Sequence, residues 1–266
     1  MQETPFPLAR RVRWPLACLV LALVSGCNLQ FGTGIEAHDA WTRSYPAKPG
    51  VVLEVRETSG LIQIDAGDGD SIVVNATRTT NAPTEEAAKA MLAEFTIAET
   101  VTADQVTLDG TSSGLSLGFN RSRRVDYHIT VPRATAVTIK STTSEIRVAG
   151  IQGALRVETT NGEITGTALG SSADVRSVNG TITLDLAKLG DAGVRCKLTN
   201  GRVVVTVPSD TKATIEASTV NGDIQAEKLS VAVREQSGRR LSGTIGGGGP
   251  DIRVDLVNGE VRIAGK

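Results

Sequence analysis

Residues 173–184 read ADVRSVNGTITL, and the Asn-Gly pair in this stretch recurs through the second half of the chain. Each pair follows a Thr or Val, and an Ile or Val stands three positions after each Asn. The complete copies are Asn161-Gly162, Asn179-Gly180, Asn200-Gly201, Asn221-Gly222 and Asn258-Gly259. Two degenerate copies, Thr143-Ser144 and Ser242-Gly243, extend the series with spacings of 16 to 21 residues. This regular period indicates a repeat architecture.

Apolar and polar residues alternate on both sides of each Asn. Four positions before it the column holds Ile139, Val157, Val175, Cys196, Ala217 and Val254. Three positions after it the column holds Ile146, Ile164, Ile182, Val203, Ile224, Ile245 and Val261. A period of two predicts strands with one buried face. The copy around Ser242 is the weak one, because Gln236 and Gly238 occupy its first apolar columns.

Asn-Gly between two strands is compatible with two architectures. A type I′ hairpin at each pair would give an antiparallel meander, whereas a corner at each pair would give coils that stack in parallel. Five positions before each Asn stand Arg156, Asp174, Arg195, Glu216 and Arg253. In a parallel stack these residues are neighbours about 4.8 Å apart, and their signs largely alternate. The pattern therefore favours an all-β fold, a β-solenoid of parallel coils of about 18–21 residues, with the meander as the alternative.

The sequence also resembles a known family. Val131-Pro132-Arg133-Ala134-Thr135, the repeated Asn-Gly phrase, and Leu241-Ser242-Gly243-Thr244-Ile245 with the glycines after it are similar to the bacterial "putative adhesin" domain of β-strand repeats, whose function is unknown. The resemblance covers roughly residues 51–266. It implies a β-helix-like solenoid and carries over no catalytic residue.

The first 50 residues predict export. Arginines precede a short apolar stretch that is typical of a signal peptide, residues 1–26. The stretch ends in Val24-Ser25-Gly26-Cys27, which resembles a lipobox, so we expect Cys27 to be acylated and to anchor the protein to a membrane. An ordinary signal peptide with a chance Cys is the alternative. Asn28 after Cys27 suggests the outer membrane, and the polar residues 27–50 predict a flexible tether.

Residues 51–266 are expected to form one solenoid domain. Its regular part is 132–266, and residues 51–131 are a divergent part with strands at 51–55, 61–64, 72–76, 101–108 and 124–131. Residues 84–95 predict an amphipathic helix, because Thr84 can cap it and an apolar stripe follows. We expect this helix to cover the open end or the flank of the core. Residues 110–123 predict a mobile loop.

Composition argues against several kinds of chemistry. The only histidines are His38 and His128, and residues 133–266 contain no Phe, Tyr or Trp. A histidine triad or histidine metal cluster in the repeats is therefore excluded, and aromatic stacking platforms are missing. A net charge of −1 gives no support for nucleic-acid binding. We expect no cofactor, a buried Cys196, and a flexible turn at Gly246–Gly249.

Two acidic features remain. Asp65, Asp68 and Asp70 are dense enough to be a weak Ca²⁺ candidate, although a tight turn between strands is the simpler explanation. Outward carboxylates such as Glu163, Asp185, Asp223 and Glu260 lie near the corners. Similar carboxylates serve β-helix enzymes, but a solvated face explains these as well.

The sequence therefore predicts a lipid-anchored, non-enzymatic envelope protein with an adhesin-like or structural role. The alternatives are a β-helix lyase or hydrolase acting on polysaccharide, and a sensory or regulatory partner in envelope stress. Protein or glycan partners are unidentified. The last strand, residues 260–264, has no cap after it, so self-association through its edge is a further hypothesis.

Overall fold

The computed structural model describes residues 34–111 and 122–266. The predicted signal peptide and Cys27 lie outside these residues. The strands are β1 (Ile35–Pro46), β2 (Val52–Gly67), β3 (Ser71–Ala82), β4 (Ala98–Val101), β5 (Gln105–Asp109), β6 (Ser122–Pro132), β7 (Ala136–Ala149), β8 (Leu155–Glu158), β9 (Asn161–Leu169), β10 (Ala173–Leu186), β11 (Val194–Val207), β12 (Ala213–Glu227), β13 (Val231–Ser237), β14 (Arg240–Ile245) and β15 (Asp251–Gly265). One helix, α1 (Glu85–Glu94), interrupts them.

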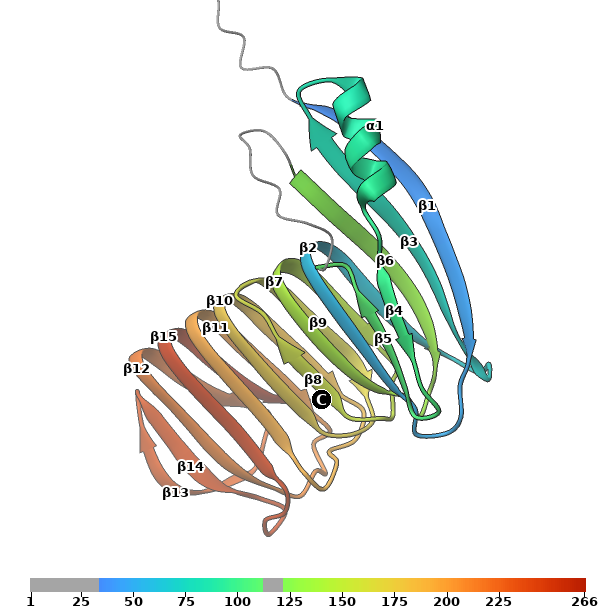
Figure 1. The fold of residues 1–266 in the computed structure, drawn as a ribbon. Helices are drawn as coiled ribbons and strands as arrows, with labels where there is room; N and C mark the ends of the chain where they lie inside the picture. Colours follow the sequence, from blue (N-terminus) through green and yellow to red (C-terminus); the bar gives the residue numbers. More distant parts are fainter. Residues whose placement is uncertain (1–33, 112–121) are drawn as a thin grey trace, which may run out of the picture. The chain divides into compact units, whose positions relative to one another are not determined.

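The repeats stack in parallel, which confirms the predicted β-solenoid. β2, β7, β8 with β9, β10, β11, β15 and β12 pair in parallel one after another (Figure 1). Each Asn-Gly pair lies directly on the Asn-Gly pair of the next coil, as Asn179 does on Asn200. Most of these strands continue on both sides of their Asn-Gly corner. Each such strand therefore forms two sides of its coil, which we call its first and second limbs. Ser59 and Gly60 form an earlier corner, beside Thr143 and Ser144.

The order of the coils differs from the order of the sequence. β15 lies between β11 and β12, and it pairs in parallel with both (Figure 1). The expectation that each coil stacks on the one before it is therefore wrong for the last coil. The chain reaches this slot through Gly246, Gly247 and Gly248, all with positive φ, which together reverse its direction between β14 and β15. The predicted glycine turn thus allows the C-terminal coil to be inserted.

Two further expectations about this end are wrong. The degenerate copy at Ser242-Gly243 is no corner, because it lies within β14, which pairs antiparallel with β12 and β13. Its apolar columns were incomplete, and the segment instead forms a hairpin that covers the first limb of β12. The last strand is no free edge, because β15 is hydrogen-bonded on both sides. Self-association through residues 260–264 therefore loses its structural basis.

At the other end the sheet becomes antiparallel, in the order β1, β3, β6. β1 shows that the predicted tether is wrong for residues 35–46. Ala37 and Tyr45 of β1 are buried and Asp39 and Trp41 between them are partly buried, and Arg78 of β3 donates to Asp39 at 2.8 Å. The alternation is present in the sequence, but Asp39 and Arg43 occupy inward-phase positions and obscure it. The strand is stabilised by its pairing with β3.

The helix is confirmed and packs on the flank of the sheet. The Thr84 hydroxyl accepts a hydrogen bond from the amide of Ala87, which caps the helix as expected. Ala88 and Met91 pack with Ala37 and Ala82 of the two outer strands in a small cluster of their own. The single strand expected at residues 101–108 is instead the antiparallel pair β4 and β5, because the Thr102 hydroxyl accepts from the Gln105 amide at 3.0 Å and closes a turn.

The core is a continuous column of aliphatic side chains inside the coils. The inward positions before and after each corner are fully buried in the internal coils, including Val157, Val175 and Ile182. Cys196 is one of these residues, so the prediction of a buried cysteine is confirmed, and burial raises the pKa of its thiol to about 12. This core leaves the outer faces of the coils as the surface that can carry function.

Candidate functional site

The corners are built by backbone geometry and by a side-chain ladder. The corner glycines have φ between +134° and +147°, whereas the only described non-glycine residues with positive φ are Ala168 and Lys228. A type I′ turn needs positive φ at both Asn and Gly, so the hairpin alternative is excluded. The reason for Gly is the close approach of the coils: a Cβ on Gly201 would lie 1.8 Å from the carbonyl oxygen of Gly180.

The corner asparagines form one continuous ladder. Asn179 donates its Nδ2 to Oδ1 of Asn161 at 2.8 Å, and Asn200 donates to Asn179 at 2.9 Å. Asn258 then donates to Asn200, and Asn221 donates to Asn258, each at 2.8 Å. The order of this ladder follows the stack, with Asn258 before Asn221. The predicted corner residues therefore have a structural role, and each asparagine is bonded to the asparagine of at least one neighbouring coil.

The inserted strand changes the charge pattern of the outer face. In the stack the order of the charged column is Arg156, Asp174, Arg195, Arg253 and Glu216. Arg195 and Arg253 are direct neighbours, so the expected alternation of sign is interrupted at this point. Like charges directly opposite each other destabilise a sheet. The sequence order would have placed Glu216 beside Arg195 and avoided this contact.

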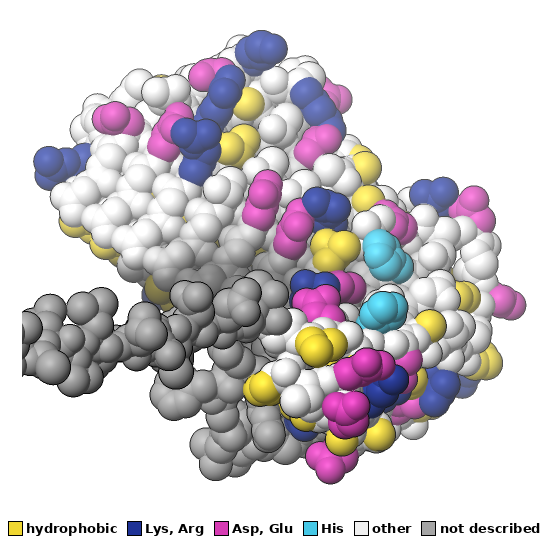
Figure 2. Space-filling model, turned by 90° about the horizontal axis from the view of Figure 1, so that it is seen from above, with side chains coloured by type: hydrophobic (Ala, Val, Ile, Leu, Met, Phe, Trp, Pro, Cys, Tyr) yellow, Lys and Arg dark blue, Asp and Glu magenta, His cyan; other side chains and the backbone are white. Residues whose placement is uncertain are grey.

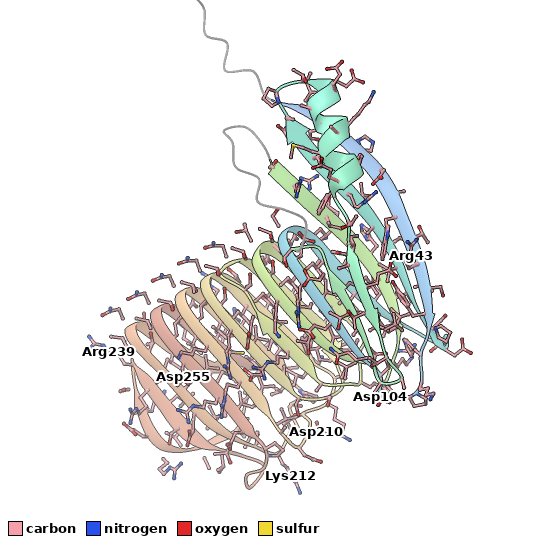
Figure 3. The ribbon with its side chains drawn as sticks, in the orientation of Figure 1. Arg43, Asp104, Asp210, Lys212, Arg239 and Asp255 are labelled. Atoms are coloured by element: carbon pink, nitrogen blue, oxygen red, sulfur yellow. The ribbon has the colours of Figure 1, made fainter. Side chains whose placement is uncertain are left out.

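Four cations meet on the outer face of β10, β11 and β15. A groove of about 420 Å³ is lined by Arg176, Arg195, Lys197, Arg253 and Asp255. We call these five residues the cationic groove. Two of its cations have ion-pair partners: Arg176 bonds to Asp174 at 3.0 Å, and Arg253 to Asp255 at 3.1 Å. In Figure 3 side chains line up from strand to strand along the stack, and Asp255 marks this face.

The two central cations of the groove are unpaired within residues 34–111 and 122–266. Arg195 and Lys197 both project from β11, and the described carboxylates nearest in register bond to other groups. Asp174 lies beside Arg195 but is held by Arg176, and Asp255 lies beside Lys197 but is held by Arg253. The groove thus presents two charged side chains that are free to bind an anion.

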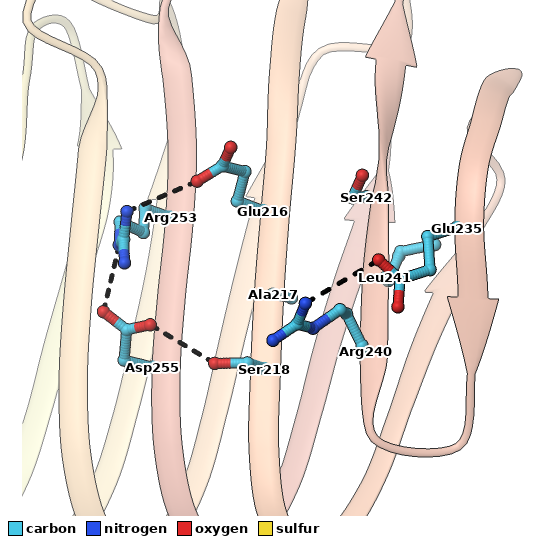
Figure 4. A pocket seen from close by; sticks show the side chains of 9 residues that line it. All are labelled: Glu216, Ala217, Ser218, Glu235, Arg240, Leu241, Ser242, Arg253 and Asp255. Atoms are coloured by element: carbon cyan, nitrogen blue, oxygen red, sulfur yellow. Dashed lines mark hydrogen bonds and ion pairs between the residues drawn. The ribbon is translucent and has the colours of Figure 1, made fainter.

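A second hollow of about 230 Å³ continues from Arg253 over β12 and β14 (Figure 4). It contains three carboxylates, and each already has a partner. Arg253 contacts Glu216 at 3.3 Å as well as Asp255, and Arg240 lies 3.8 Å from Glu235. Asp255 also accepts from the Ser218 hydroxyl at 3.3 Å. These carboxylates act as partners of arginines, and they extend the groove as a surface of mixed charge.

Glu57 of β2 is a buried acid that could have been a candidate in the sequence but was not singled out there. Glu57 is 2% exposed, and its Oε1 accepts from the amide of Thr58 at 2.9 Å. Its Oε2 and the hydroxyl of buried Tyr127 have no partner among the described residues. Burial raises the pKa of Glu57 to about 7, and the carboxylates of Asp109 and Asp126 add to the increase. The signal was available, because Glu57 continues the inward alternation of Leu53 and Val55.

The structure brings the other predicted site residues to separate places. Asp65 lies near the end of β2 and accepts from Gln63 at 2.8 Å, whereas Asp68 lies in the turn before β3 and bonds to Arg133 at 2.8 Å. Asp70 lies in the same turn, and the weak Ca²⁺ candidate is not assembled. No three His, Cys, Asp or Glu side chains are grouped to hold a metal ion in the part of the chain that the structure describes.

The outward carboxylates near the corners do not converge. Arg202 pairs with Glu260 at 3.0 Å, and Lys266 pairs with Asp185. Glu163 and Asp223 lie at the same position of two separate coils, β9 and β12. Figure 2 shows that charges of both signs are interspersed over one face, with histidines among them. His38 and His128 line a shallow hollow of about 660 Å³ with Asp126 and Glu145.

The described residues contain no helix that is long and apolar enough to cross a membrane.

Comparison with known proteins finds one family model and several similar solved structures. The family model described as Toastrack DUF4097 matches residues 50–264. No curated protein matches the chain. Solved structures similar to it include a "putative cell adhesion protein" from Clostridium sporogenes, with 15% identity and a TM-score of 0.47 over 86% of this chain and 100% of that one.

Two further solved structures carry the name "putative adhesin". The protein from Bacteroides fragilis has 13% identity and a TM-score of 0.37, over 86% of this chain and 97% of that one. The protein from Parabacteroides distasonis has 10% identity and a TM-score of 0.30, over 88% of this chain and 98% of that one.

Proposed function

The chain belongs to the Toastrack DUF4097 family, and we propose that it is an exported, lipid-anchored envelope protein that binds an anionic polymer on the outer face of its solenoid. The role is adhesin-like and non-enzymatic. The observation that carries the proposal is the cationic groove, where Arg195 and Lys197 have no carboxylate partner within the described residues.

The groove favours binding of an anion because, when no anion is bound, cations lie directly beside one another. Arg195 lies directly beside Arg253, and Lys197 lies directly beside Arg176. A sulfate or phosphate ester placed between such cations removes their repulsion and accepts charge-assisted hydrogen bonds from them. Arginine is suited to this contact, because its planar guanidinium donates two parallel hydrogen bonds to such groups.

The spacing of the groove suits a polymer better than a single ion. Neighbouring coils are about 4.8 Å apart, and alternate residues of one strand are about 6.6 Å apart. The four cations therefore form a short zigzag across β10, β11 and β15. The hollow beside it continues along the stack with Arg240 at its far side. A chain with anionic groups at regular intervals can contact several of these positions at once.

A polysaccharide-active enzyme is a weaker reading of the same surface. A glycosidase needs two carboxyl groups that are free to act on the glycosidic bond. The carboxylates of Glu216, Glu235 and Asp255 are instead held by arginines. No specific contact favours a sensory role in envelope stress. The adhesin-like proposal is therefore the one that the charged groups of this face support.

The test is binding to dextran sulfate, with uncharged dextran as the reference polymer. Dextran sulfate should bind the wild-type protein at low salt, and affinity should fall steeply as salt is raised, because exposed charges are screened. The double variant Arg195→Gln/Lys197→Gln should bind at least tenfold more weakly. The control Lys140→Gln/Arg156→Gln removes the same two charges from nearby coils and should bind within about twofold of wild type. Equal losses in both variants would contradict a localised groove.

The lipid anchor has a separate test. Mass spectrometry of the mature N-terminus should show a diacylglyceryl group on Cys27, and the protein should fractionate with the outer membrane. An unmodified N-terminus, or one that begins elsewhere, would contradict the anchor without affecting the binding proposal.

A further inference from the structure

The two limbs of β12 have different neighbours, and one of them is open. Residues 213–218 pair with β14 on one side and with β15 on the other. Residues 221–227 pair only with β15 among the described residues. Because β15 lies between β11 and β12, the second limb of β12 is the last strand of the parallel stack. Its outer edge presents backbone donors and acceptors that no described strand satisfies.

The core is also incompletely covered at this edge. Ile224 is only partly buried, whereas the equivalent Ile164 and Ile182 of internal coils are 0% exposed. Ala226 is exposed, whereas the equivalent Leu184, Val205 and Ile263 are 0% exposed. The same apolar column that is sealed between internal coils therefore ends in contact with solvent. One more strand would bury it.

The corner at this edge specifies what such a strand must contain. Asn221 donates to Asn258, and its own Oδ1 has no donor among the described residues, so one more asparagine could extend the ladder here. From β9 onward each coil contributes a glycine at the corner, whereas β7 has Ser144 there, and a Cβ on Gly222 would lie 1.6 Å from the carbonyl oxygen of Gly259. We therefore expect a strand that continues the stack across Gly222 to carry glycine at this position.

Charge decides which chain can supply this strand. Asp223 has no ion pair in the described residues and lies beside Glu260, which is held by Arg202. A second copy paired antiparallel about Gln225 would place Asp223 opposite Glu227, and a parallel copy in register would stack Asp223 on Asp223. Both arrangements oppose like charges. Within the stack, Arg202 of β11 lies beside Glu260 of β15 at this same position and forms an ion pair with it. An arginine therefore fits next to a carboxylate here.

We propose that the open edge at residues 221–227 binds an extended segment of another protein as an added parallel strand, with Asn-Gly in register with Asn221-Gly222 and a cation opposite Asp223. Backbone hydrogen bonds give such a complex its affinity, and the side chains in register give its specificity. The chain's own residues 197–206, KLTNGRVVVT, carry this pattern and provide a probe of known sequence.

The experiment measures fluorescence anisotropy of the labelled KLTNGRVVVT peptide with the full mature protein, lipid anchor intact, in detergent. Saturable binding to the wild type is expected. Peptides with Ala in place of the glycine, or Glu in place of the arginine, should bind at least tenfold more weakly. Absence of saturable binding, or equal binding of all three peptides, would overturn the proposal.

Protein variants locate the site. Asp223→Lys should weaken binding of the peptide at least fivefold and improve binding of the Glu-substituted peptide. Glu163→Lys is the matched control, because it changes the same position in a coil that is paired on both sides, and it should bind like wild type. If Asp223→Lys unfolds, Asp223→Asn provides the same comparison. Equal effects of the two lysine substitutions would place the peptide elsewhere.

Light scattering separates this proposal from self-association. The wild type should be monomeric without peptide, and a dimer abolished by Asp223→Lys would show that a second copy occupies the edge, which would overturn the proposal. The Arg195→Gln/Lys197→Gln variant should bind the peptide like wild type. A failure of the polymer-binding proposal is thereby distinguishable from a failure of this one.

Discussion

Asn258 donates a hydrogen bond from its side-chain Nδ2 to Oδ1 of Asn200 at 2.8 Å, although 58 residues separate the two. This contact exists because β15 is inserted between β11 and β12. The same insertion places Arg253 beside Arg195 and leaves the second limb of β12 at the end of the stack. Both proposed binding surfaces therefore follow from one feature of the topology.

The asparagine ladder should contribute to stability according to the number of bonds that each member makes. Asn200 donates to Asn179 and accepts from Asn258, whereas Asn221 makes one ladder bond. Asn200→Ala should lower the free energy of unfolding by about 1–2 kcal/mol, and Asn221→Ala by about half as much. Urea unfolding measures both values. Equal losses would mean that the ladder bonds do not contribute.

Glycine at an internal corner should be indispensable. Gly201 has a φ of +136°, and a Cβ there would collide with the backbone of the neighbouring coil. We expect Gly201→Ala to lower the free energy of unfolding by about 3 kcal/mol or more. Gly69→Ala is the control, because a Cβ on Gly69 meets nothing within 4 Å. A Gly201→Ala protein as stable as the control would contradict the close stacking of corners.

The buried carboxyl of Glu57 predicts a dependence of stability on pH. Burial raises its pKa from 4.5 to about 7 in the folded protein. The folded state therefore binds more protons than the unfolded state between these values, so the stabilisation is complete below pH 4.5 and is lost as the pH rises through 7. The change amounts to about 3 kcal/mol for this group.

Comparison of the wild type with Glu57→Gln isolates this contribution from the other titrating groups. The variant should gain about 3 kcal/mol relative to wild type between pH 4.5 and pH 8, because its amide does not ionise. Chemical unfolding at the two pH values gives the difference. Parallel stability profiles of the two proteins would show that Glu57 titrates normally.

Much of the coil structure could be predicted from the sequence, because strand alternation has a fixed period. Val157, Val175 and Cys196 were assigned to one inward column, and all three are 0% exposed. The corner glycines follow from a close approach that only glycine permits. The helix after Thr84 could also be predicted, because its cap and its apolar stripe are local signals.

The order of the coils could not be predicted from these columns. Cys196 can pack on Val254 as well as on Ala217, since inward residues of similar size are interchangeable in a repeated core. The cationic groove was therefore missed, because it depends on which coil lies beside β11. Glu57 was missed for another reason. Its inward phase with Leu53 and Val55 was the available signal, but a carboxyl side chain beside a turn is normally exposed to solvent.

The most direct test of the account is a disulfide between residues 195 and 253. In a Cys196→Ala form of residues 28–266, Arg195→Cys/Arg253→Cys should oxidise readily, because directly paired strands bring Cα atoms within the range that a disulfide spans. Arg195→Cys/Glu216→Cys should stay reduced within the monomer, since β15 separates these strands. The opposite result, a bridge from 195 to 216 and none from 195 to 253, would show that the coils stack in sequence order, which would contradict the inserted strand.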